Sequence, residues 1–193
     1  MVQIFVDKKL KEFIKYKKGE NMNILHIVFS HGKESGPWGS KITKMAEHAK
    51  TICSGEIHSI DYQDLSSPYK RVERLVEYLK DLEGEIILVG SSMGGYVSTV
   101  ASNKVSVAGL VLLAPAFYLP DYAIAKPITS CNNITIIHGW TDDIVPFQNS
   151  VAFAKQHKAK LVLVDDGHRL SDSGLTLNLE LEGIIKESRI AKL

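Results

Sequence analysis

From residue 23 onwards, two patterns of apolar residues alternate along the chain. Short runs that are apolar throughout are separated by longer segments in which apolar residues recur every three or four positions. Uninterrupted short runs are typical of strands buried on both faces, and the longer spacing is typical of amphipathic helices. We therefore predict an α/β fold with a mostly parallel central sheet of about six strands and helices on both faces.

The same pattern places the individual elements. The predicted strands are 24–29, 55–60, 85–89, 107–113, 134–137 and 160–164. The predicted helices are 38–50, about 72–82, 96–102, 151–157 and 175–187. Because no repeat or linker divides 22–193, we predict a single domain over that range.

Residues 1–21 differ from the rest because lysines crowd this segment. Leu10, Phe13 and Ile14 recur at helical spacing, so a short amphipathic helix is one prediction. This basic N-terminal extension could lie on the domain surface, precede a natural start at Met22, or contact a partner or a membrane surface. The sequence leaves these alternatives open.

The composition is that of an ordinary globular protein, with 45% hydrophobic and 23% charged residues among 193. A formal net charge of +1 does not favour nucleic acid as a partner. The only two cysteines of the sequence, Cys53 and Cys131, lie far apart without C-x-x-C spacing, so they form neither a disulfide framework nor a cysteine-based zinc site. The chain has neither a span of about 20 apolar residues nor a secretion signal. We expect a cytoplasmic protein without integral membrane association, and the oligomeric state stays open.

The motif G-x-S-x-G at 90–94, centred on Ser92, stands between a predicted strand and a predicted helix. A strand that turns sharply into a helix can lift a serine out of the sheet as a nucleophile elbow. Gly90 and Gly94 fit this interpretation because the elbow brings backbone against backbone, where a side chain would collide. A plain turn of glycine and serine is the alternative.

Polar residues also follow the other predicted strands, where parallel sheets gather their ligands. His31-Gly32-Lys33 follows the first strand, Asp142 the fifth and His168 the sixth. A serine hydroxyl needs a base to take its proton, and histidine titrates in the right range for that task. The histidine in turn needs an orienting acid, and the chain order Ser92, Asp142, His168 suits an elbow serine.

Together these motifs resemble those of small serine esterases of the α/β-hydrolase superfamily, over nearly everything from Met22 to the end. The motifs are G-x-S-x-G at 90–94, H-G-x-x-D-x-x-V-P at 138–146, and the glycine-histidine pair at 167–168. The resemblance implies a triad of Ser92, Asp142 and His168 that needs no cofactor. The resemblance assigns the role of the triad acid to Asp142 and not to its neighbour Asp143. It gives His138 a structural role, which is to hold the loop that carries Asp142.

The resemblance also implies an oxyanion hole made of backbone N–H groups. One belongs to Met93, directly after the nucleophile, and the other to Lys33 in the loop after the first strand. Phe117 and Trp140 are candidates for lining the acyl pocket, with plain packing as the alternative. The interval 115–133 is too short for a large lid, so we expect an open and shallow acyl site.

The expected activity is hydrolysis of small to medium acyl esters or thioesters. A serine peptidase or amidase would use the same triad, and a non-catalytic binding protein could retain the fold. No metal site is expected. His26 and His31 lack a companion ligand pattern, His26 is interpreted as a buried hydrogen-bonded residue, and His48, His58 and His157 as surface or packing residues.

Overall fold

The computed structural model describes residues 24–120 and 122–190. Its elements, in chain order, are β1 (Leu25–Ser30), α2 (Ser40–Ile52), β2 (Glu56–Ile60), α3 (Pro68–Lys80), β3 (Glu85–Ser91), α4 (Met93–Ala101), β4 (Gly109–Leu113), β5 (Ile134–Gly139), α5 (Phe147–His157), β6 (Lys160–Val164) and α6 (Gly174–Ile190). The extension predicted at 1–21 lies outside the described residues.

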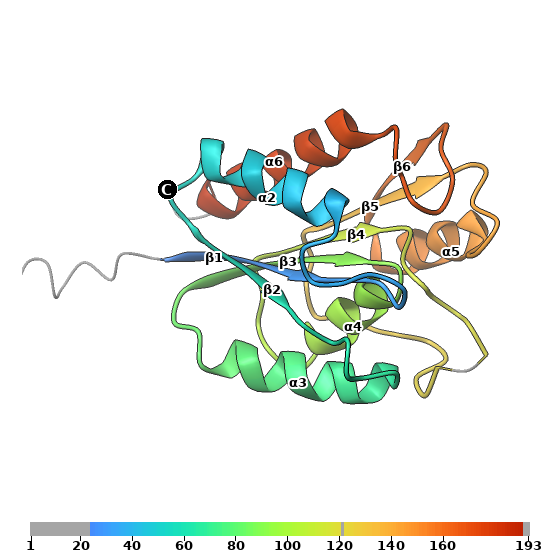
Figure 1. Ribbon diagram of the computed structural model, residues 1–193, viewed down its shortest axis with the longest axis horizontal. Coiled ribbons are helices and arrows are strands. Elements are labelled where there is room, and N and C mark those ends of the chain that lie inside the picture. The colour runs from blue at the N-terminus through green and yellow to red at the C-terminus, as the bar shows by residue number, and fades with distance from the viewer. Residues whose placement is uncertain (1–23, 121, 191–193) are drawn as a thin grey trace, which may run out of the picture.

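The strands form one six-stranded sheet in the order β2-β1-β3-β4-β5-β6, and every neighbouring pair is parallel. The α/β fold and the six-stranded sheet predicted from the sequence are therefore confirmed. Because all strands run the same way, every carboxyl end lies along one edge of the sheet (Figure 1). The loops that follow β1, β3, β5 and β6 consequently meet at that edge.

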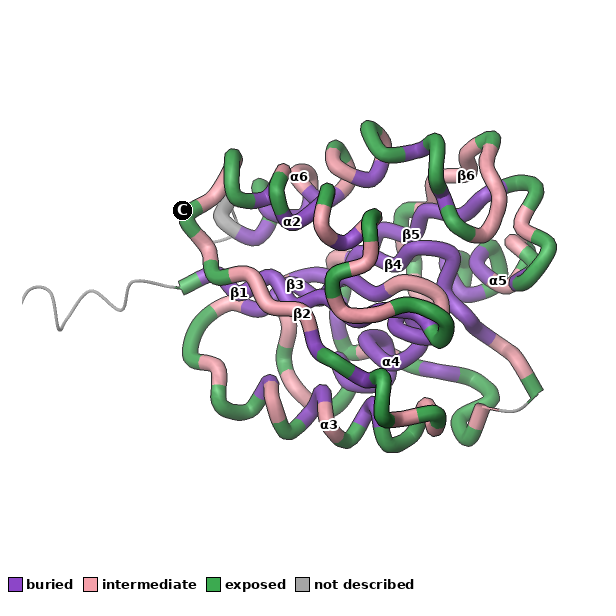
Figure 2. The backbone as a smooth tube through the Cα atoms, viewed as in Figure 1, coloured by how far each residue is buried: buried purple, intermediate pink, exposed green. Residues whose placement is uncertain are grey.

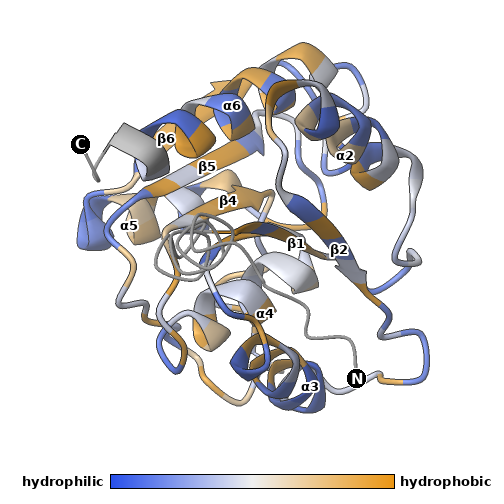
Figure 3. Cartoon of the chain, turned by 90° about the vertical axis from the view of Figure 1, so that its left-hand side faces the viewer, coloured by the Kyte–Doolittle hydropathy of each residue, from blue (hydrophilic) through white to orange (hydrophobic). Residues whose placement is uncertain are grey.

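Helices cover both faces of the sheet, with α2 and α6 on one side and α3, α4 and α5 on the other (Figure 1). Successive strand residues contribute to opposite faces, so Leu88 packs towards α3 and α4 while Ile87 and Val89 pack towards α2 and α6. Both faces are therefore buried, which explains why the central strands are apolar throughout. Figure 2 shows these strands buried, and Figure 3 shows the apolar sheet enclosed by helices with polar outer faces.

Helices α3, α4 and α5 begin three or four residues earlier than the sequence pattern predicts, and α3 begins at Pro68. Helix α4 begins at Met93, immediately after Ser92, because the glycines of the motif join the helix instead of a loop before it. Helix α5 begins at Phe147, directly after Pro146, whose ring suits a helix start. Between β4 and β5, the described residues 114–120 and 122–133 contain no helix, so no lid domain stands there, as expected.

Candidate active site

Ser92 occupies a strained turn between β3 and α4. Its backbone has φ 53° and ψ −117°, a conformation that side-chain-bearing residues rarely adopt. The turn is held by the Ser92 N–H, which donates to the Leu113 carbonyl at 2.9 Å. A Cβ added at Gly90 would collide with the Gly94 backbone, and one at Gly94 would collide with the Ser30 carbonyl. Both glycines are thus required by close backbone packing, as predicted for a nucleophile elbow.

The structure brings Ser92, His168 and Asp142 together from three different loops. The Ser92 hydroxyl lies 3.0 Å from His168 Nε2, and His168 Nδ1 lies 2.7 Å from Asp142 Oδ2. A carboxylate can only accept, so Nδ1–H donates to Asp142 and Nε2 accepts the Ser92 proton. This arrangement places a hydroxyl, an imidazole and a carboxylate in a single line of hydrogen bonds, the geometry that a serine nucleophile with its base would need.

The Asp142 carboxylate is fully enclosed, with a side-chain exposure of 0%. Burial alone would raise its pKa, but hydrogen bonds from the Val145 N–H, His168 and the Ile144 N–H together hold the pKa of Asp142 below its usual range. The two backbone bonds to Oδ1 measure 2.8 and 2.9 Å. Asp142 is therefore an anion at neutral pH and fixed in one orientation.

A second histidine, His138, contacts the same carboxylate from the end of β5. Its Nε2 lies 2.9 Å from Asp142 Oδ2 and 3.0 Å from the Val145 carbonyl, while its Nδ1 lies 2.7 Å from the Ser150 hydroxyl. Burial lowers the pKa of His138, so the ring is neutral and Nε2–H is the donor. His138 thus closes the Asp142 loop, which is the structural role expected for it.

The loops that carry the acid and the histidine are tied to each other through Asp166. Thr141 donates twice to the Asp166 carbonyl, from N–H at 3.1 Å and from Oγ1 at 2.9 Å. The Asp166 carboxylate accepts from the Gly167 N–H, the Asp172 N–H and the Ser173 hydroxyl. Asp166 was not singled out in the sequence; its only signal is its place in the turn-forming run before His168.

Lys41, from the first turn of α2, reaches the loop that carries His168. Its Nζ donates to the Arg169 carbonyl at 2.9 Å. Burial lowers the pKa of Lys41 to about 8, against the attraction of Asp166 and Asp142. A lysine so close to the site is a second residue that the sequence pattern did not indicate.

The two segments that carry the backbone groups predicted for the oxyanion hole, the start of α4 and the loop after β1, both lie beside Ser92. The Met93 N–H is the first of α4, and the first N–H groups of a helix have no partner within it. On the other side, a Cβ added at Gly32 would lie 3.4 Å from Ser92 Cβ, so the loop after β1 runs directly past the serine. Lys33 is exposed and lies in the turn that follows Gly32.

The loop after β1 rests on Arg71, a buried residue of α3 that sequence reasoning missed. Its guanidinium donates to the Leu65 carbonyl at 2.7 Å and to the Gly32 carbonyl at 3.2 Å. Burial lowers the pKa of Arg71, yet arginine stays charged in proteins. The sequence did contain a hint of this role. Arg71 recurs at four-residue spacing with Leu75 and Leu79, which places it on the apolar face of the helix, where a charged side chain needs a partner.

His31 reinforces the same loop from inside the core. Its Nδ1 lies 2.7 Å from the Gly32 carbonyl, and its Nε2 accepts the Tyr62 N–H at 3.0 Å. Both contacts require a neutral ring with the proton on Nδ1, and burial lowers the pKa of His31 in agreement. The Gly32 peptide is therefore held by two donors beside Ser92.

The two aromatic residues suggested for the acyl pocket take different positions. Phe117 has no exposed surface and stacks on Phe153 in the core, at 4.2 Å between ring centroids. Its position favours the packing alternative. Trp140 is 51% exposed after β5 and packs edge-on against Phe147. Trp140 remains the candidate for contacting substrate.

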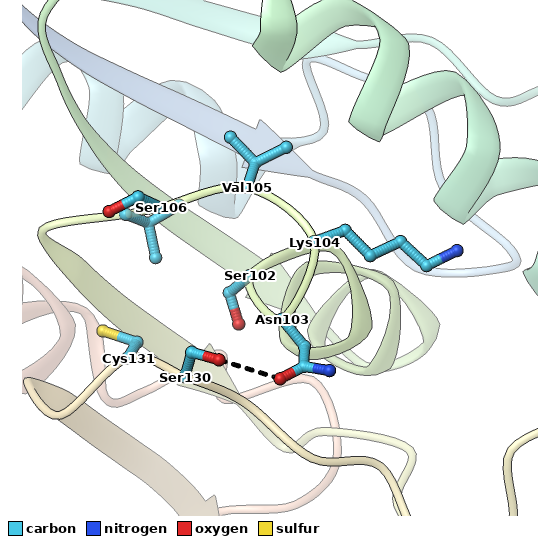
Figure 4. A pocket seen from close by; sticks show the side chains of 8 residues that line it. Ser102, Asn103, Lys104, Val105, Ser106, Ser130 and Cys131 are labelled. Atoms are coloured by element: carbon cyan, nitrogen blue, oxygen red, sulfur yellow. Dashed lines mark hydrogen bonds between the residues drawn. The ribbon is translucent and has the colours of Figure 1, made fainter.

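A pocket of about 210 Å³ lies away from Ser92, around the carboxyl end of α4 (Figure 4). It is lined by the turn 102–107 together with Ser130 and Cys131. Ser92 stands at the other end of this nine-residue helix, about 14 Å away along its axis. Small side chains that bond one another, such as Ser130 and Asn103 at 2.9 Å, line it. The pocket is separate from the candidate active site.

A family model matches residues 26–130, more than half of the chain. The chain belongs to the uncharacterised protein family UPF0227. The UPF0227 match includes Ser92 and the loop after β1 but ends before Asp142 and His168. No curated protein matches the sequence.

Several solved structures share the fold of this chain. A protein of Xanthomonas campestris assigned to the alpha/beta hydrolase superfamily is 28% identical, with a TM-score of 0.75, over 83% of this chain and 98% of that one. Est1E from Butyrivibrio proteoclasticus is 20% identical, with a TM-score of 0.69, over 91% and 92%. Mouse alpha/beta hydrolase domain-containing protein 10 is 21% identical, with a TM-score of 0.70, over 84% and 90%. The resemblance to the α/β-hydrolase superfamily is thereby confirmed, and the Xanthomonas campestris protein supports a hydrolase, while the other two structures show the shared fold.

Within the part of the chain that the structure describes, no helix combines the length and apolar character that a membrane span requires.

Proposed function

We propose that the protein is a serine hydrolase that cleaves carboxylic ester or thioester bonds of small to medium acyl substrates. The observation that carries the proposal is the line of hydrogen bonds from Ser92 Oγ through His168 to Asp142, at 3.0 and 2.7 Å. The strained elbow at Ser92 and the enclosed Asp142 anion support the same roles.

In the proposed reaction, Ser92 Oγ attacks the acyl carbonyl carbon while its proton passes to His168 Nε2. The carbonyl oxygen becomes an anion that the Met93 and Lys33 N–H groups stabilise. Collapse breaks the bond to the alcohol or thiol, which leaves with the proton from His168. Water then attacks the acyl-enzyme, gives a proton to the same nitrogen, and releases the acid and Ser92.

The preference for small to medium acyl groups rests on the absence of a helix between β4 and β5 in the described residues of that interval. An open site does not enclose a long acyl chain. Exposed Trp140 at the same edge of the sheet offers an apolar surface for the acyl group or its leaving group.

A fluorophosphonate probe tests the nucleophile. The wild type should be labelled once per chain, and Ser92→Ala should not be labelled. Ser91→Ala is the matched control because Ser91 precedes the elbow at the end of β3, and it should be labelled like the wild type. Persistent labelling of the folded Ser92→Ala protein would overturn the assignment.

A chain-length series of p-nitrophenyl esters, run beside matching thioesters and anilides, tests the bond and the acyl group. We expect the highest kcat/KM for short to medium acyl chains, and a loss of about 10⁴-fold or more in Ser92→Ala. Cleavage of anilides in preference to esters would instead indicate an amidase. Labelling without turnover of any substrate would indicate a binding protein that retains the fold.

A further inference from the structure

Away from the candidate active site, a histidine from β1 and a histidine and a glutamate from β2 meet on the sheet face covered by α3. His26 lies beside Glu56 in the register of the two parallel strands. His58 is two residues after Glu56, so it points to the same face. His26 and Glu56 stand near the amino ends of their strands and His58 in the middle of β2, whereas Ser92 follows the carboxyl end of β3.

The potential ligand atoms of this cluster form a small triangle. His26 Nδ1 lies 3.0 Å from His58 Nε2, and Glu56 Oε2 lies 3.4 Å from the first nitrogen and 3.7 Å from the second. Ligands about 2.0 to 2.1 Å from a tetrahedral zinc ion are separated by about 3.3 Å. The observed triangle therefore has the size of one face of a zinc coordination shell.

The outer atoms of both rings are oriented by further hydrogen bonds. His26 Nε2 lies 3.1 Å from the Glu83 carbonyl, which can only accept, so this nitrogen carries the proton and Nδ1 keeps its lone pair. His58 Nδ1 lies 2.8 Å from the Tyr78 hydroxyl. Metal-binding histidines usually donate their second N–H to a carbonyl or another oxygen, which fixes the ring and its tautomer.

The burial of the three residues suits an ion that enters from one side. The His26 side chain is nearly enclosed, at 4% exposed, whereas Glu56 is 59% exposed. Solvent above Glu56 can supply the remaining ligand of a tetrahedral ion.

We propose that His26, Glu56 and His58 form a zinc-binding site that fastens the edge strand β2 to β1. Water supplies the fourth ligand, and Tyr78 and Glu83 orient the two imidazoles from outside. The site is independent of the hydrolase chemistry because it lies at the opposite ends of the strands. Its role is to stabilise the sheet edge.

Without a metal, the same atoms form a chain of hydrogen bonds. Tyr78 O–H donates to His58 Nδ1, and His58 Nε2–H donates to His26 Nδ1. Zinc binding moves the His58 proton from Nε2 to Nδ1, where it is donated to the Tyr78 oxygen, and no net proton is lost. These hydrogen bonds give the ring nitrogens of His26 and His58 partners when no ion is bound.

The proposal is tested on the untagged full-length protein after treatment with a chelator and its removal. Calorimetric titration with ZnCl₂ should give one zinc per chain, and zinc at 100 times its Kd should raise the Tm by about 5 °C or more. His58→Gln and Glu56→Gln should each weaken zinc binding at least about tenfold. Both replace partly exposed residues, and each fold is checked by circular dichroism.

His48→Gln is the matched control, because His48 also faces a single carboxylate, Glu182, at 3.5 Å but lacks a second histidine. It should bind zinc like the wild type. Absence of zinc binding by the folded wild type, or unchanged binding in His58→Gln and Glu56→Gln, would overturn the proposal. So would loss of binding in His48→Gln alone. Ester hydrolysis and probe labelling are measured separately and should not respond to the chelator.

Discussion

Two clusters at opposite ends of the strands use the same groups, a hydroxyl, an imidazole and a carboxylate. They differ in how the carboxylate is surrounded. The Asp142 carboxylate, at the carboxyl ends of the strands, is enclosed and accepts hydrogen bonds from two backbone N–H groups and two histidines. The Glu56 carboxylate, at the amino ends, is mostly exposed. The residues are Ser92, His168 and Asp142 at the carboxyl ends, and Tyr78, His58 and Glu56 at the amino ends.

This difference determines what each cluster can do. A carboxylate whose oxygens accept hydrogen bonds from several donors stays ionised and holds the neighbouring imidazole in one orientation. An imidazole that acts as a general base requires such an orienting group. An acid with exposed oxygens beside two imidazole nitrogens has ligand positions to offer a cation. The same functional groups thus suit the proposed proton transfer at one edge of the sheet and the proposed metal binding at the other.

The largest expected effect comes from removing the enclosed acid. Asp142→Asn should lower kcat for ester hydrolysis by about 10³ to 10⁴-fold, because the amide no longer fixes the His168 tautomer or balances its charge. The neighbouring Asp143→Asn is the control and should keep nearly full activity. Steady-state kinetics with a p-nitrophenyl ester measures both, and equal loss in the two variants would contradict the assignment of Asp142.

The next effect concerns Arg71, whose guanidinium donates to the Gly32 carbonyl in the loop after β1. Arg71→Met should lower kcat/KM by about 10 to 100-fold and the free energy of unfolding by about 1 to 3 kcal/mol, because the Leu65 and Gly32 carbonyls lose their buried donor. Arg74→Met removes an exposed arginine of the same helix that pairs with Asp64. It should change both quantities little.

Fluorophosphonate labelling rates and urea titrations distinguish the two contributions of Arg71. If Arg71 acts only on stability, labelling of the folded variant proceeds at the wild-type rate. Arg71→Lys, which keeps the charge but not the forked geometry, should recover stability better than activity.

A smaller effect is expected at Gly32, which lies against Ser92. Gly32→Ala places a methyl group 3.4 Å from Ser92 Cβ, a contact that the fold tolerates but that narrows the space for the substrate oxygen. We expect kcat/KM to fall by roughly tenfold, with a Tm within a few degrees of the wild type. Gly36→Ala, farther along the same loop, should leave kcat/KM unchanged.

The smallest effect is the acid dependence of stability. Because folding lowers the pKa of Asp142, its contribution to stability is present above the unfolded pKa of about 3.9 and is lost as the pH falls through the lower folded value. The difference in unfolding free energy between the wild type and Asp142→Asn should therefore shrink from pH 6 to pH 3. Urea titrations over this range measure it, and Asp143→Asn should show the wild-type dependence.

The sequence predicted much of the fold and the line of Ser92, Asp142 and His168, because each depends on local signals. Apolar runs identify buried strands, and G-x-S-x-G marks a turn whose glycines pack against backbone. The alignment of the three side chains then follows from their positions after parallel strands. Their catalytic roles stay predictions that the variants above test.

The residues that sequence reasoning missed depend on contacts distant in the chain. Arg71 and Asp166 bond backbone groups of other loops, and no spacing within their own segments indicates those partners. The His26 and His58 pair is similar, because only the strand register brings His26 beside Glu56. The sequence did show a polar residue at a position where the helix face or strand is otherwise apolar. It did not show which group that residue would bond.

The elbow at Ser92 also has a consequence for biosynthesis. Its backbone is held by the carbonyl of Leu113 and by the N–H of Ala116, both of which leave the ribosome after it. The proposed acid, Asp142, and the proposed base, His168, follow later still, so Ser92 is synthesised before the residues that would activate it. On the proposed function, covalent labelling of Ser92 should therefore report only on molecules whose synthesis and folding are nearly finished.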